Sequence, residues 1–266
     1  SIGLVGSEMC IRDRNNKTGD NSMKAVPAEG GMFLYEKPEY LSPKTHADIG
    51  WRTPTQPYAF ARAVNSIPLV ASEIPSAQKF YPIIFPDMER GGPIAVFSTE
   101  EGTNPFVSDD GNWMQDYYIP AYLRRYPIAT VKGDQDKVAI VVDRSSEGIV
   151  ENADSKFFEG DKLTSWGQSL VDFSVQYEQD VIETRLFVNK LRDLKLLTTK
   201  HVGQTIDGED RAYANFISID GDVLKNLSND QLLELNNKGY LAIIFAQLFS
   251  QENWSKIISK RTDLQI

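Results

Sequence analysis

A short stretch from Gly111 to Ile128, GNWMQDYYIPAYLRRYPI, concentrates the side chains of this chain that could bind a ligand. An arginine guanidinium can bind a carboxylate or phosphate through two parallel hydrogen bonds, and aromatic rings can form the wall of such a pocket. The stretch therefore predicts a site for an anionic ligand or a peptide. The candidate binding residues are Trp113, Tyr118, Tyr122, Arg124 and Arg125.

The same stretch could instead be a densely packed corner of the core, because aromatic and arginine side chains also make specific packing contacts. In that case the arginines would pair with Asp116 or Asp143. If the segment is extended, Arg124 and Arg125 face opposite sides and only one of them can enter a pocket. On a helical turn both could lean outward. Both interpretations stay open at this point.

The sequence contains no recognisable catalytic motif. His46 and His201 are the two histidines, and neither lies in a catalytic motif. There is no G-x-G-x-x-G, P-loop or G-x-S-x-G pattern. The acidic clusters, such as Asp109-Asp110 and 207–210, match only fragments of a calcium loop and lie beside residues that favour turns. We therefore predict no metal and no cofactor, and leave the catalytic residues and enzymatic activity open.

Composition limits the class of partner. The formal net charge is −9, which argues against nucleic acid because phosphate neutralisation needs a basic surface. The most apolar run, Tyr240–Phe249, is much shorter than the roughly 20 residues of a membrane-spanning helix. No signal peptide is recognisable. We therefore expect a cytoplasmic protein without a membrane span, whose partner is a small anionic ligand or another protein.

The beginning of the chain needs separate treatment. The first 14 residues, SIGLVGSEMCIRDR, look like a translated sequencing-adapter remnant and contain the single cysteine, Cys10. Residues 15–31 are polar and rich in glycine, which is typical of disorder. We therefore expect 1–31 to be disordered or artefactual, with a natural start at Met23 or Met32, and 32–266 to form one domain.

The N-terminal half predicts short elements, because its many prolines each remove a hydrogen-bond donor and restrict the preceding residue. Ile128–Val131 and Val138–Val142 flank a polar KGDQDK loop and predict an antiparallel hairpin. Asp109-Asp110-Gly111 predicts a tight turn before Trp113. Further predicted elements are helices at 58–64 and 76–80 and strands at 80–85, 94–98 and 105–107.

The C-terminal half reads as helical. From about Gly167 to Leu194, apolar residues recur every three or four positions, which predicts a long helix with one apolar stripe. After it we expect a loop at 203–211, a strand at 214–219, and a helix that opens with a capping box at Ser228. A deeply buried helix at 240–249 and a last helix capped by Ser250 follow. We therefore predict an α+β fold, with an antiparallel sheet in the N-terminal half and helices from about 167 packed against it.

Three segments resemble the bacterial SapC family, which is named for a protein linked with paracrystalline surface layers. The segments are PYAFARAVNSIPLVASEIPSAQKFYPIIF (57–85), NPFVSDDGNWMQDYYIPAYLRRYPI (104–128) and GYLAIIFAQLFSQENW (239–254). The likeness runs in the same order from about Met32 to Lys260. The family name implies an association with the cell surface, and the resemblance implies no catalytic residues for this chain.

These observations predict a SapC-like bacterial protein that acts as a non-catalytic binding or assembly component. The alternative is an enzyme or small-molecule-binding protein that uses the aromatic and arginine residues of 113–125 to hold an anionic ligand or peptide. The sequence leaves the oligomeric state open.

Overall fold

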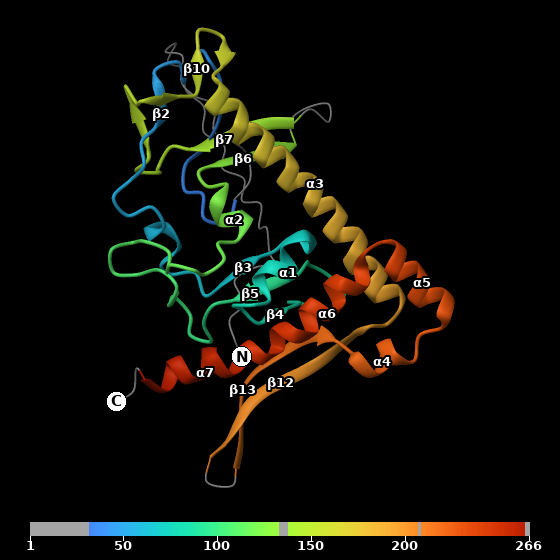
Figure 1. The fold of residues 1–266 in the computed structure, drawn as a ribbon. Helices are drawn as coiled ribbons and strands as arrows, with labels where there is room; N and C mark the ends of the chain where they lie inside the picture. The colour runs from blue at the N-terminus through green and yellow to red at the C-terminus, as the bar shows by residue number, and fades with distance from the viewer. Residues whose placement is uncertain (1–31, 133–137, 207–208, 264–266) are drawn as a thin grey trace, which may run out of the picture.

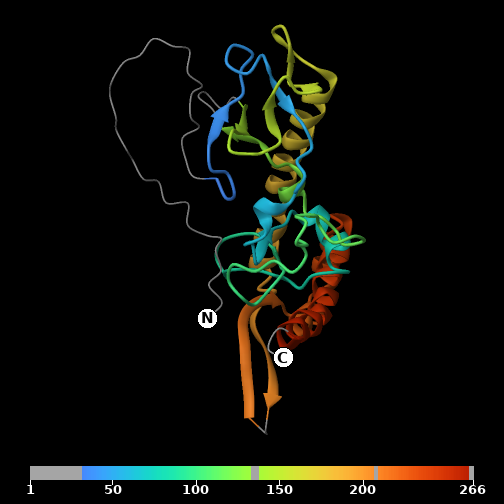
Figure 2. The same ribbon diagram turned by 90° about the vertical axis from the view of Figure 1, so that its left-hand side faces the viewer.

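The computed structural model describes residues 32–132, 138–206 and 209–263. Small antiparallel sheets lie in the N-terminal half, and helices dominate from Ser165 onward, so the α+β class is confirmed (Figure 1). The long helix α3 (Ser165–Asp193) runs from the small sheets to the C-terminal helices (Figure 2). The predictions for 1–31 and for the loop at 133–137 lie outside the described residues.

The N-terminal strands are short and pair in several small antiparallel sheets. One sheet has the order β1-β7-β6, from Pro38–Tyr40, Val138–Asp143 and Ile128–Lys132, which confirms the predicted hairpin. A second has the order β8-β2-β9, from Ile149–Glu151, Ile49–Trp51 and Ser155–Lys156. The third joins β3, β5 and β4, from Ser66–Pro68, Ile94–Val96 and Ile83–Ile84. The strands β10 (Phe158–Glu159) and β11 (Lys162–Leu163) pair beside the start of α3.

Helical turns between these strands are equally short. Proline at the second position of α1 (Ile74–Ala77) is compatible with a helix start, because the amide it lacks has no partner within the helix there. The predicted helix at 76–80 therefore begins two residues earlier. The remaining turns are η1 (Ala59–Ala61), η2 (Ala71–Glu73) and α2 (Ala121–Arg124).

Helix α3 follows the predicted apolar stripe. The Thr164 side chain accepts a hydrogen bond from the Gly167 amide and caps the helix. Tyr177, Val188 and Leu191 are buried along one face, which confirms the pattern read from the sequence. The helix ends at Asp193, and Lys195 takes a positive φ of 54°.

Two hydrophobic clusters lie along α3. Its first turns carry Trp166 and Leu170, which pack against a smaller cluster under the N-terminal sheets. Its second half carries Phe187 and Leu191, which belong to a larger core together with Phe97. Because α3 packs against both clusters, it supports one domain over 32–266, although that assignment stays a prediction. The smaller cluster consists of Ile49, Ile128, Val142, Ile149, Phe157 and Phe158.

The predicted loop at 203–211 was wrong. Strands β12 (Leu197–Ile206) and β13 (Glu209–Ile219) form one long hairpin that projects from the rest of the molecule (Figure 2). Backbone hydrogen bonds between strands form whatever the polarity of the side chains. The polar composition of 203–211 was therefore misleading as a sign of a loop. The register shifts by one residue between Val202 and Gly203, which pair with Ala214 and Ala212, so the extra residue of this bulge lies on β13.

The C-terminal helices are α4 (Gly221–Lys225), α5 (Asn229–Asn237), α6 (Tyr240–Ser250) and α7 (Trp254–Asp263). The capping box at Ser228 is confirmed, since its hydroxyl and the Gln231 side chain exchange hydrogen bonds with each other's backbone amides. Two expectations were wrong. Helix α6 exposes one face, where Phe249 is 59% exposed. Ser250 does not cap α7, because its hydroxyl binds the Ile83 amide and the Gln247 carbonyl instead.

Candidate functional site

The aromatic and arginine stretch forms an irregular loop followed by the single helical turn α2. A buried carboxylate, Glu73, holds the start of this turn. It accepts hydrogen bonds from the Ala121 amide and from the Tyr118 hydroxyl at 2.8 Å, and from the Val70 amide at 3.2 Å. Burial raises the pKa of Glu73, and these donors oppose the rise because they favour the ionised form.

Arg125 lies inside the protein. Its guanidinium carbon is 4.3 Å from the ring centroids of both Tyr122 and Tyr177, so the cation sits between two aromatic faces. Its Nη1 donates to Glu178 Oε1 at 3.0 Å. Burial alone would lower the pKa of this guanidinium, but the hydroxyls of Tyr35, Tyr177 and Tyr122 together with Glu178 raise it above its ordinary value. Glu178 is the charged partner of this buried guanidinium, and Arg125 Nε has no hydrogen-bond partner among the described residues.

Arg124 lies at the surface, with 42% of its side chain exposed. Its Nε donates to the Ile119 carbonyl at 3.0 Å, and its guanidinium lies over the rings of Tyr118 and Phe173 at 5.8 and 5.2 Å. The distance to Glu73 Oε1 is 4.0 Å, a loose ion pair. The helical turn thus separates two neighbouring arginines, one buried and one open to solvent.

The structure does not gather the five candidate residues in one place. Tyr118 contacts Arg124, and Tyr122 contacts Arg125. Trp113 is buried against Phe97 and Phe106, with ring centroids 5.4 and 6.2 Å apart.

The predicted pairing of the arginines with Asp116 or Asp143 was wrong. The partners are Glu73 and Glu178, which lie far away in the sequence.

An open pocket lies at the end of the same stretch. It has a volume of about 400 Å³, within the range of small-molecule sites. Its aromatic walls are Trp51, Phe60, Tyr126 and Tyr35, and we call it the Trp51 pocket. Its polar lining comes from Glu36, Gln56, Ser145, Ser146 and Glu147.

Close packing fixes the aromatic walls. The Phe60 ring stacks on Tyr126 with centroids 4.0 Å apart, and Tyr35 meets Tyr126 edge-on at 5.4 Å. The Tyr126–Pro127 peptide bond is cis. A Cβ at Gly148 would lie 2.1 Å from Trp51 Cζ3, so the indole occupies space that only a glycine leaves free.

The electrostatic character of the Trp51 pocket is acidic. Glu36 and Glu147 are exposed, and neither makes an ion pair within the described part of the chain. No described lysine or arginine contributes to the lining. A cation is attracted by carboxylates and by the faces of aromatic rings, so this lining suits a positively charged group.

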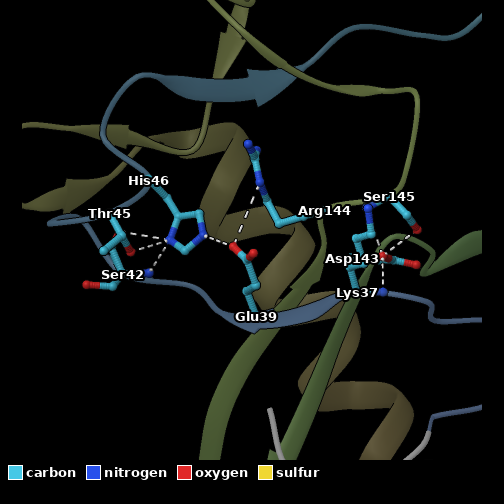
Figure 3. A network of polar contacts seen from close by, with 8 residues as sticks. All are labelled: Lys37, Glu39, Ser42, Thr45, His46, Asp143, Arg144 and Ser145. Carbon is cyan, nitrogen blue, oxygen red and sulfur yellow. Dashed lines mark hydrogen bonds and ion pairs between the residues drawn. The ribbon is translucent and has the colours of Figure 1, made fainter. Parts of the chain in front are cut away.

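Asp143 forms hydrogen bonds with several residues that line the pocket. Its carboxylate accepts hydrogen bonds from the amides of Glu36 and Lys37, each at 3.0 Å, and from the Tyr126 hydroxyl at 3.2 Å. The Ser145 amide and hydroxyl add two more, at 3.0 and 2.7 Å (Figure 3). Burial raises the pKa of Asp143, but these hydrogen bonds outweigh it and hold the pKa below its usual value.

A second polar network lies beside Asp143 (Figure 3). The His46 ring accepts at Nδ1 from the Ser42 amide at 3.2 Å, so we assign its proton to Nε2, which lies 3.2 Å from Glu39 Oε2. The Thr45 hydroxyl lies 2.8 Å from Nδ1, and Arg144 Nε lies 3.8 Å from the same Glu39 oxygen. The chain of contacts runs in the order hydroxyl, imidazole, carboxylate, as in a catalytic triad. His46 is only 1% exposed, so its ring is enclosed by the fold and not open to solvent.

The SapC family model matches residues 41–257, which is most of the chain. This chain belongs to the SapC family. No curated protein and no solved structure matches it significantly. The three segments that suggested the resemblance all lie within the matched range.

In this SapC-family protein, none of the five candidate residues lines the Trp51 pocket, although Tyr126 from the same stretch does. Trp51, Phe60 and Ser145 come from three separate segments, and only the tertiary structure brings them together. Within residues 32–132, 138–206 and 209–263, no three histidine, cysteine, aspartate or glutamate side chains are grouped so that they could hold a metal ion. No described helix is both long and apolar enough to cross a membrane.

Proposed function

We propose that this SapC-family protein is a non-catalytic binding or assembly component that holds a basic side chain of a protein partner in the Trp51 pocket. The supporting observation is the lining of that pocket, which combines four aromatic walls with the carboxylates of Glu36 and Glu147, neither of which forms an ion pair with a described residue. A lysine or arginine side chain has an apolar stem for the rings and a cationic head for the carboxylates.

The arrangement of Ser145 and Asp143 favours binding over catalysis. The Ser145 hydroxyl donates to Asp143 at 2.7 Å, which is the distance of a nucleophile from a general base. A general base works best with a pKa near the working pH, whereas that of Asp143 is lowered below the ordinary range of a carboxyl. A carboxylate that already accepts hydrogen bonds from several donors is a weak base, so we assign Asp143 a structural role.

A second candidate function follows from Arg124, the solvent-exposed arginine of the pair. Its guanidinium lies over Phe173 and Tyr118, and its contact with Glu73 is loose, so an anionic ligand could compete for it. In this alternative Tyr118 would contribute to the site. Arg125, Tyr122 and Trp113 would support it from the core, because all three are buried.

Isothermal titration calorimetry with short capped peptides tests the first proposal. We expect Ac-Gly-Lys-Gly-NH2 and Ac-Gly-Arg-Gly-NH2 to bind weakly, with dissociation constants of about 1 mM, and the matched glutamine peptide to bind at least tenfold more weakly. Glu36→Gln and Glu147→Gln should each reduce the affinity about threefold to tenfold. Glu159→Gln, at an exposed glutamate outside the pocket, is the matched control and should change nothing.

Equal binding of the lysine and glutamine peptides would rule out the cationic preference. Selective binding of inorganic phosphate or citrate that disappears in Arg124→Gln would instead favour the anionic alternative. Hydrolysis of a peptide or ester by the native protein, abolished in Ser145→Ala, would contradict the non-catalytic role.

A further inference from the structure

A second cavity lies against helix α3. It has a volume of about 460 Å³. One wall is α3, through Val181 and Val188, and the facing wall is the segment at 68–70 with Pro93. Gly91 and Gly92 also line it. We call it the Gly92 pocket.

The walls of the Gly92 pocket are held open by ordered contacts. Arg192 donates from Nε to the Met88 carbonyl and from Nη2 to the Gly91 carbonyl, each at 3.0 Å, and so fixes the loop to α3. Gly91 has a φ of +77°, a conformation that glycine adopts without strain, and a Cβ there would meet Pro86. Thr184 binds the Ala71 amide at 2.7 Å and ties the facing segment to the same helix. The cavity is therefore part of the fold.

The charge of the Gly92 pocket is opposite to that of the Trp51 pocket. Arg185 and Arg192 both line it, and no aspartate or glutamate in the described part of the chain does. Among the described residues, Arg185 makes no hydrogen bond or ion pair and is exposed at the rim. Arg192 donates hydrogen bonds to the loop. It also interacts electrostatically with the carboxylate of Asp87, which does not line the cavity. Arg185 therefore places a positive charge beside a largely apolar cavity, in a chain whose formal net charge is −9.

We propose that the Gly92 pocket binds an amphiphile with an apolar body and a single carboxylate. The apolar part lies between Val181, Val188 and Pro93, and the carboxylate meets Arg185 at the rim. A free medium-chain carboxylic acid and the C-terminus of a peptide that ends in an apolar residue share this chemistry. The proposal is independent of the function assigned to the Trp51 pocket.

Calorimetric titration of the full chain with sodium hexanoate, octanoate and decanoate, below their micelle concentrations, tests the proposal. We expect one site and an affinity that rises about fourfold for each added methylene until the pocket is full. Decylammonium, which has the same apolar chain and the opposite charge, should bind at least tenfold more weakly than decanoate. A peptide arm compares Ac-Gly-Gly-Leu with its C-terminal amide and shows which source of the carboxylate binds more tightly.

Variants separate the head group from the apolar body. Arg185→Gln should weaken decanoate binding about tenfold, because it removes the charge-assisted contact. Arg52→Gln is the matched control, since Arg52 is an exposed arginine that lines neither pocket. Gly92→Leu should block the cavity, because a Cβ there meets only Thr184 Cγ2 at 3.6 Å and the longer side chain can enter the open space. Circular dichroism melts confirm that each variant is folded.

Three results would overturn the proposal. The first is equal binding of decanoate and decylammonium. The second is an unchanged decanoate affinity in both Arg185→Gln and a folded Gly92→Leu. The third is the absence of binding by every carboxylate and by the peptide with a free C-terminus.

Discussion

Replacing Arg125 by alanine gives the sharpest test of the aromatic and arginine cluster. The side chain is 5% exposed and lies between Tyr122 and Tyr177 at 4.3 Å from each ring. If Arg125 is a packing residue, its removal destabilises the fold. If it is a ligand-binding residue in an open site, the fold tolerates the change and only binding is lost.

The magnitude follows from the contacts of Arg125. Alanine removes two buried methylenes, worth about 1.6 kcal/mol together. It also removes two desolvated cation–π contacts, worth about 1 to 2 kcal/mol each. Relief of the desolvation cost of the guanidinium offsets part of this loss. Glu178 is 43% exposed and can be hydrated after its partner is removed, so it adds little. We expect a net loss of about 3 kcal/mol in the free energy of unfolding.

Urea unfolding followed by far-ultraviolet circular dichroism measures this loss, with an unchanged slope as evidence that the same folded state unfolds. Arg124→Ala is the matched control on the next residue. Because Arg124 is 42% exposed and loosely paired, we expect it to cost less than about 1 kcal/mol. Losses for the two variants within about 0.5 kcal/mol of each other would refute the reasoning. A stable Arg125→Ala protein that fails to bind anions would place Arg125 in a ligand site.

Three further predictions concern other parts of the fold. Asp143→Asn should cost about 2 to 3 kcal/mol at neutral pH, because an amide donor then faces backbone donors. The pKa of Asp143 is lowered in the folded state, so its contribution to the free energy of unfolding is complete above the ordinary carboxyl pKa and is lost as the pH falls through the lowered value. Urea unfolding at a series of pH values should therefore show that the variant loses less stability on acidification than the native protein. Gly148→Ala should displace the Trp51 indole and weaken lysine-peptide binding in calorimetry, with an unchanged affinity counting against the proposed pocket. Gln247→Leu should cost about 2 to 4 kcal/mol in urea unfolding, because the fully buried amide binds the Ile83 carbonyl at 2.7 Å, and a neutral effect would contradict that role.

Local patterns allowed several elements to be predicted. The apolar spacing of 167–194 gave α3, because a stripe of that period can be buried only by a helix. The serine and glutamine of 228–231 gave the start of α5, because the capping interaction lies within four consecutive residues. The strand predicted at 214–219 lies within β13, but β12 and the first part of β13 escaped prediction, because their pairing depends on the backbone and their residues carry no clear alternation.

The candidate site was only partly predictable. Sequence composition drew attention to 111–128, and Tyr126 from that stretch does line a pocket. The partners of the arginines, Glu73 and Glu178, are separated from them by about fifty residues, and no local rule connects such distant positions. The apolar cavity with Arg185 was missed for the same reason, since α3 forms only one of its walls.

The sequence by itself determined the family, the α+β class, the acidic charge and the long helix, because each depends on composition or on short-range periodicity. The tertiary structure decided which arginine is buried. On the helical turn α2, Arg125 points between Tyr122 and Tyr177, and Arg124 points to solvent. The tertiary structure also divided charge between two pockets, acidic around Trp51 and basic around Arg185. Both outcomes depend on which distant segments pack together, and that is set by the burial of apolar surface across the whole chain.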